Sequence, residues 1–120
     1  MTLIYTKKLK KYIDKLSSSS KREDKITVAE IFRILDLLEN KVYLLSYPYS
    51  KILSGYKYKS INLRELRIES NVPIRIFYFI KNNEVIVLFD YKIKKSRKLG
   101  DTVLNPIFQK MKNLIDEMEE

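Results

Sequence analysis

The first forty residues place apolar and charged positions with the period of an α-helix. Within residues 7–16 the apolar residues recur at i, i+3, i+4 and i+7 and so form one stripe, which comprises Leu9, Tyr12, Ile13 and Leu16. Residues 21–40 keep the same period, and the four serines between the two segments favour a turn. The pattern predicts two helices that form an antiparallel hairpin and face one sheet.

The middle of the chain changes to a strand pattern. Residues 41–56 contain Pro48 and Gly55 and indicate irregular structure, after which residues 57–68 predict a strand interrupted by charges. Residues 74–80 are β-branched or aromatic and are apolar on both faces except at Arg75.

A tight turn is expected after that strand, because asparagine tolerates positive φ and the segment 81–84 contains Asn82 and Asn83. Residues 85–89 form the returning strand. Since both strands are apolar on both faces, we expect them to be the central pair of a sheet that is covered on each side.

The ends of the chain complete the expected fold. Asn105 and Pro106 favour the start of a C-terminal helix, and residues 2–6 favour a short first strand. The sequence predicts a single α+β domain over residues 1–120: an N-terminal helical hairpin packed on a small, mostly antiparallel, twisted sheet of three to four strands, with a C-terminal helix.

The composition limits the kinds of active site and metal site that the chain can form. The chain has no cysteine and no histidine, so it has no thiolate site and lacks the commonest metal ligand and general base. No cluster of Asp and Glu suggests a magnesium site, and we expect neither metal nor cofactor. No apolar run is long enough for a membrane span and no signal-peptide pattern is present, so we expect a cytoplasmic protein.

Positive charge is concentrated in one section. Residues 41–100 carry thirteen Lys or Arg residues against four Asp or Glu residues, an excess equal to the +9 net charge of the whole chain. A local excess of this kind favours a polyanionic partner such as nucleic acid, and the alternative is a solvated basic face without a specific partner.

Arg75 is the first candidate for a functional residue, because a cation within an apolar strand needs water, a carboxylate or a ligand on its side of the sheet. A salt bridge to Glu65 or Glu69 on the neighbouring strand is the structural alternative, and the strand pattern alone slightly favours it.

Two further basic groups flank this strand. One follows Asp90 and Tyr91 at the exit of the second central strand and comprises Lys92, Lys94, Lys95, Arg97 and Lys98. The other lies on the preceding strand and comprises Lys57, Lys59, Arg64 and Arg67. Both groups converge on one face only if the strand register allows it, and the pattern does not fix that register.

Six segments, in order and spacing, give the chain a resemblance to the RelE/ParE toxin superfamily, most closely to its HigB-like, phage-derived branch. The resemblance as a whole extends over about residues 9–118. The six segments are Tyr12 to Leu16, Ile34 to Glu39, Pro48 to Leu53, Glu65-Leu66-Arg67, Ile74 to Tyr78 and Lys94 to Lys98.

The resemblance implies the toxin of a type II toxin–antitoxin system, and specifically a ribosome-dependent endoribonuclease that cleaves mRNA and inhibits translation. It implies a cognate antitoxin, of the helix-turn-helix kind, and the ribosome and mRNA as partners. By position, Arg67, Arg75 and the Lys94/Lys95 pair are similar to the basic active-site residues of the family.

The chain also departs from the family pattern. A histidine that some members use is replaced by Asp90, which becomes a candidate base, with Tyr91 as a candidate acid. We expect the remaining cations to bind RNA: Lys57, Lys59, Arg64, Lys92, Arg97 and Lys98. The alternatives are a ParE-like toxin that inhibits DNA gyrase and a non-catalytic nucleic-acid binding module.

Overall fold

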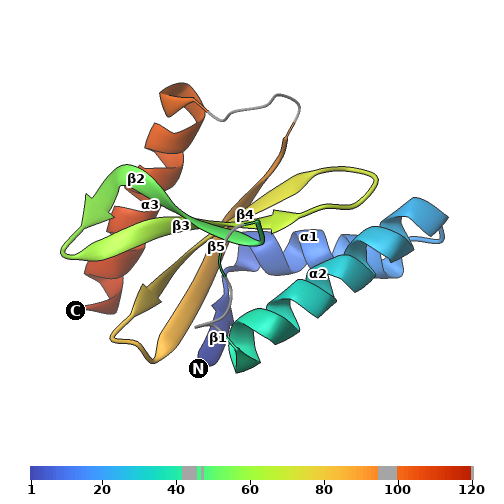
Figure 1. The fold of residues 1–120 in the computed structure, drawn as a ribbon, viewed down its shortest axis with the longest axis horizontal. Helices are drawn as coiled ribbons and strands as arrows, with labels where there is room; N and C mark the ends of the chain where they lie inside the picture. Colours follow the sequence, from blue (N-terminus) through green and yellow to red (C-terminus); the bar gives the residue numbers. More distant parts are fainter. Residues whose placement is uncertain (42–45, 47, 95–99, 120) are drawn as a thin grey trace.

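The structure is a computed structural model that describes residues 1–41, 46, 48–94 and 100–119. Its elements, in chain order, are β1 (Thr2–Tyr5), α1 (Lys7–Ser18), α2 (Arg22–Asn40), β2 (Ser50–Tyr58), β3 (Ile61–Ile68), β4 (Ile74–Lys81), β5 (Val85–Ile93) and α3 (Asp101–Met118). Within the described residues, five strands form one sheet in the order β1-β5-β4-β3-β2 (Figure 1). β1 runs parallel to β5, and the other neighbours are antiparallel.

Helices cover both faces of the sheet. The α1–α2 hairpin covers one face, where its stripe meets Leu66, Ile76 and Leu88 in a buried cluster. α3 covers the other face and packs on Phe77 and Phe79. The two clusters alternate along β4, as the pleat requires. β4 and β5 lie inside the sheet with both faces covered, which confirms the predicted central pair.

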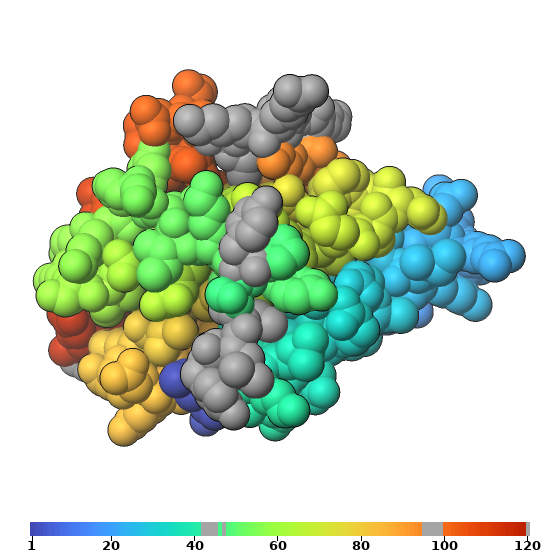
Figure 2. All heavy atoms as spheres, in the orientation of Figure 1, coloured from blue at the N-terminus to red at the C-terminus, as the bar shows by residue number. Residues whose placement is uncertain are grey.

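The helical hairpin projects beyond the sheet at the turn between α1 and α2, as Figure 2 shows at the blue end of the molecule. None of the helices in the described part of the chain is long and apolar enough to cross a membrane. The short first strand expected at residues 2–6 is present as β1.

The expected number of strands was wrong, because part of the segment predicted as irregular is β2. The alternation in β2 is obscured by a bulge between Ile52 and Lys57, and within it Gly55 has a φ of 89°. β2 begins at Ser50, a buried polar residue whose hydroxyl shares a hydrogen bond with the Tyr78 hydroxyl. The sheet therefore has five described strands, where three to four were expected. It is mostly antiparallel, as expected, and β1–β5 is the parallel pairing among the described strands.

The start expected for the C-terminal helix was also wrong. α3 begins at Asp101 after Gly100, and Pro106 lies inside it. Val103 and Leu104 donate backbone hydrogen bonds to Gly100 O, so the first turn forms ahead of the proline. Leu104 is buried, and the core contact of α3 begins one turn earlier than the Asn-Pro signal indicated.

The predicted turn between β4 and β5 is confirmed. Asn82 and Asn83 have φ values of 55° and 54°, so both occupy the left-handed region, and the Glu84 N–H closes the turn by donating to Lys81 O at 3.1 Å.

We expect Asn83→Ala to lower the free energy of unfolding by about 1 kcal/mol, because alanine is strained at positive φ. Asn83→Gly is the matched variant and should keep or raise stability, since glycine has no Cβ. Urea unfolding of the three proteins measures both changes, and equal stabilities for the alanine and glycine variants would contradict the assigned turn.

Candidate functional site

Three cations from three neighbouring strands form a row across the sheet. Arg67 on β3 lies opposite Arg75 on β4, and Arg75 lies opposite Lys92 on β5. Directly opposed residues in antiparallel strands point to the same face. Here it is the face that α3 covers, because Phe77 lies two residues from Arg75 on β4 and packs in the cluster that contains α3. The register that the sequence left open is one that brings the basic residues of three strands together.

A buried carboxylate lies inside this row. The Glu65 side chain is 7% exposed, and its Oε1 lies 3.3 Å from Arg67 Nε and 4.0 Å from Arg75 Nε. Sequence reasoning treated Glu65 only as a partner for Arg75. Its spacing of two residues from Arg67 on one strand was the signal that both belong to one face.

Arg75 is buried and only partly satisfied. Its Nη1 donates to Ile74 O at 3.3 Å and lies 3.3 Å from Oε1 of Glu69, whose side chain is 66% exposed. Its Nε has no hydrogen-bond partner among the described residues. Both salt bridges considered from the sequence are therefore present, and one buried donor of Arg75 is left for an anionic oxygen.

Lys94 adjoins the row where β5 ends. Its backbone N–H donates to Pro73 O at 2.8 Å, which fixes the residue beside the start of β4. Burial, followed by the charges of Arg75 and Arg67, lowers the pKa of the Lys94 ammonium. Lys94 thus lies within the electric field of both arginines and gives up its proton more readily than an isolated lysine.

Asp90 has a different environment. Its Oδ1 lies 2.6 Å from Lys8 Nζ on α1, and its Oδ2 lies 3.0 Å from Lys110 Nζ on α3. Burial raises the pKa of the Asp90 carboxyl, but hydrogen bonds from the two lysines and from the Tyr91 N–H outweigh burial and lower it overall. The structure places this candidate base in an ion-pair bridge between the two helices.

Tyr91 faces away from the cationic row. It lies opposite Ile76 and stacks on Tyr12 of α1, with ring centroids 3.9 Å apart. Its backbone neighbours Asp90 and Lys92 point to the α3 face, and alternation turns Tyr91 to the α1–α2 face. The candidate acid is thereby separated from Arg67 and Arg75.

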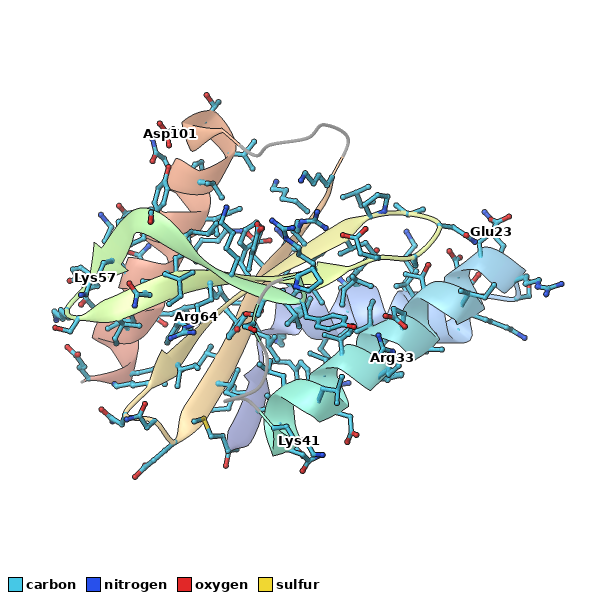
Figure 3. The ribbon with its side chains drawn as sticks, viewed as in Figure 1. Glu23, Arg33, Lys41, Lys57, Arg64 and Asp101 are labelled. Carbon is cyan, nitrogen blue, oxygen red and sulfur yellow. The ribbon has the colours of Figure 1, made fainter. Side chains whose placement is uncertain are left out.

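The basic residues of β2 and the start of β3 lie outside the row. Lys59 forms salt bridges with Asp116 at 3.0 Å and with Glu119 at 2.7 Å, so it ties the β2–β3 turn to the end of α3. Arg64 lies opposite Tyr78 and points to the α1–α2 face, as does Lys57 by alternation (Figure 3). The predicted residues Lys95, Arg97 and Lys98 lie outside the described part of the chain.

A protein-family model described as "Phage derived protein Gp49-like (DUF891)" matches residues 11–112. The chain belongs to this Gp49-like family. Gp49-like proteins are a phage-derived, toxin-like family of toxin–antitoxin systems, and the matched segment contains every residue of the cationic row. No curated protein matches the chain.

A toxin-like Gp49-like protein pairs with an antitoxin, so the expected class of partner follows from the family. The phage-derived, toxin-like class that the six sequence segments indicated is confirmed.

We expect Arg75→Gln to raise the pKa of Lys94, because removing a nearby positive charge favours the protonated ammonium. NMR titration of the lysine side-chain signals measures this pKa directly. Arg64→Gln removes the same charge from the opposite face and should leave it unchanged. A Lys94 pKa that is equal in both variants would show that Arg75 does not act on Lys94.

We expect Asp90→Asn to lower the free energy of unfolding by about 1.5–3 kcal/mol at neutral pH, since it removes the charge that pairs with Lys8 and Lys110. The folded-state pKa of Asp90 is lowered, so this contribution is complete above the ordinary pKa of 3.8 and is lost as pH falls through the folded value. Urea unfolding at neutral and acidic pH checks both statements. A difference between the two proteins that stays constant down to acidic pH would contradict them.

Proposed function

We propose that this Gp49-like protein is a RelE/HigB-like toxin, a ribosome-dependent, metal-independent endoribonuclease that cleaves mRNA and so inhibits translation. The observation that carries the proposal is the row of Arg67, Arg75 and Lys92 with Lys94 beside it. The proposed partners are the ribosome, mRNA and a cognate antitoxin of the helix-turn-helix kind.

The charge and spacing of the side chains in the row suit the binding of a phosphodiester group. Two guanidinium groups on adjacent strands can hold non-bridging phosphate oxygens, and rigid strands fix their positions before substrate arrives. The buried Nε of Arg75, which has no hydrogen-bond partner among the described residues, is a donor already desolvated. The exposed Glu69 carboxylate, which contacts Arg75 Nη1, is the group that a phosphate oxygen would replace.

The proposed reaction needs only groups of the substrate and of this site. The ribose 2′-oxygen attacks the adjacent phosphorus, the P–O5′ bond breaks, and the products are a 2′,3′-cyclic phosphate and a 5′-hydroxyl. Glu65 accepts the 2′-hydroxyl proton, Arg67 and Arg75 stabilise the added negative charge, and Lys94 donates a proton to the leaving 5′-oxygen.

This assignment gives the proton transfers to Glu65 and Lys94 in place of Asp90 and Tyr91. Asp90 already accepts hydrogen bonds from two lysines, and Tyr91 stacks on the other face of the sheet. Within the described ranges no group of three or more metal-ligating side chains lies together, and the proposed steps use none.

We expect Arg75→Ala to abolish growth inhibition and to reduce mRNA cleavage by about 10²–10³-fold, because it removes a charge that acts on the transition state. The matched control is Arg33→Ala on α2, whose guanidinium pairs with Glu30 away from the row. Both variants should still fold and still bind the antitoxin.

Purified ribosomes with a defined mRNA, together with a DNA gyrase supercoiling assay, separate the candidate functions. Cuts at defined mRNA positions that require Arg75 support the ribonuclease. Inhibition of supercoiling without cleavage would instead indicate a ParE-like gyrase inhibitor, and the absence of both would leave a non-catalytic binding module. Undiminished toxicity of Arg75→Ala would overturn the assigned site.

A further inference from the structure

The start of α1 carries a concentration of lysines that the cationic row does not include. Four of its first five residues are lysines, and all four are exposed. We name the surface formed by Lys7, Lys8, Lys10 and Lys11, together with Lys110 of α3, the α1 lysine surface.

This arrangement is unfavourable for the helix itself. The first turn of α1 contains no acidic residue, and positive side chains there oppose the positive end of the helix dipole. Lys7 and Lys11 are spaced i, i+4, which adds repulsion between like charges. Among the described residues, Lys8 and Lys10 have carboxylate partners, Asp90 and Asp14, whereas no ion pair joins Lys7 or Lys11 to an acidic group.

The α1 lysine surface adjoins the candidate site through β5. Asp90 and Lys92 lie two residues apart on one face of the strand, a separation of roughly 6.6 Å, and Lys92 is the end of the cationic row. Because Asp90 holds both Lys8 and Lys110, it fixes these two lysines next to that end. Positive charge therefore continues from Arg67 across the sheet to α1.

The surface is also hollowed. One shallow depression is lined by the four α1 lysines and Asp14. A second lies between the end of β1 and α3, where Lys8 and Lys110 flank Phe89 and Leu114. Lys8 lines both depressions, so the two adjoin at this lysine, where β5 lies beside the start of α1.

We propose that the α1 lysine surface binds the phosphates of RNA that flanks the cleavage site. This inference rests on the proposed ribonuclease function and extends it, because it assigns the RNA backbone beyond the reacting phosphate to a second surface. A row of phosphates has the regular negative charge that such a surface of lysines complements.

An acidic protein segment is the competing occupant, and the surface lacks what such an interface needs. Protein interfaces are organised around buried apolar or aromatic anchors. No large apolar side chain is exposed between Lys7 and Ser18, all of which are described. Contacts made by charge alone, without apolar anchors, are typical of binding to a nucleic-acid backbone.

The test uses Lys7→Gln/Lys11→Gln, since these two lysines hold no salt bridge in the described structure. The control is Lys21→Gln/Lys25→Gln at the start of α2, which removes the same charge from exposed positions. The probe is a ribosome carrying an mRNA with 2′-O-methyl riboses, which cannot be cleaved, and its affinity is measured over a range of monovalent salt. Antitoxin affinity is measured for the same proteins.

We expect the Lys7/Lys11 variant to lower the slope of log K against log salt by roughly 0.7–0.9 per lysine, and to weaken binding by roughly sixfold per lysine at about 0.1 M salt. The control variant should retain the slope of the unaltered protein. Antitoxin affinity should be equal in all three proteins.

The outcomes separate the two proposals. If the unaltered protein does not bind the ribosome, the proposed function fails and this inference with it. If it binds in a manner that depends on Arg75, yet the Lys7/Lys11 variant keeps the full salt slope, the α1 lysine surface alone is overturned. A loss of antitoxin affinity with an unchanged RNA slope would assign the surface to an acidic protein and also overturn it.

Discussion

One extra residue in β5 determines how the rest of the site is arranged. Phe77 lies opposite Asp90 while Tyr78 lies opposite Leu88, so Phe89 has no partner on β4 and forms a bulge. Without the bulge, alternation would turn Asp90 and Lys92 to the α1–α2 face. With it, Lys92 completes the row with Arg75, and Asp90 lies between the two helices that it bridges.

The carboxylates around these cations set a balance between the stability of the fold and the positive charge available to a ligand. The cations nearest the core are each held by carboxylates, Arg75 and Arg67 by Glu65 and the two bridging lysines by Asp90. A buried guanidinium without such partners would be costly. Full neutralisation would leave nothing for a ligand. The Nε of Arg75 marks where it is incomplete, because Glu65 Oε1 lies 4.0 Å away and no described residue accepts a hydrogen bond from this Nε.

The sequence alone predicted much of the fold because its strongest signals are local. Helical periodicity, two apolar strands and an Asn-Asn turn each depend on neighbours in the chain, and all are present in the structure. β2 was missed because its bulge breaks the alternation from which strands are recognised. The start of α3 was misplaced because an Asn-Pro pair resembles a helix start even inside a helix.

For the site, residue type was informative and position was not. Arg75 was found because it interrupts an apolar strand, and this needs no knowledge of register. The grouping of Arg67, Glu65 and Lys92 around it depends on the β3–β4–β5 register, which a pattern of alternating residues leaves undetermined. Asp90 and Tyr91 adjoin the site in sequence but have other contacts. The bulge places Asp90 next to Lys8, and alternation turns Tyr91 to the opposite face, where it stacks on Tyr12.

The parallel pairing of β1 with β5 has a consequence for the order of folding. β1 (Thr2–Tyr5) finds its neighbour only when residues 85–88 have been synthesised. The helical hairpin has mainly local contacts and can form early, whereas closure of the sheet waits for contacts far apart in the chain. All the strands that carry the cationic row belong to this later part, so the folded scaffold and the row of Arg67, Arg75 and Lys92 form together once β5 has been synthesised.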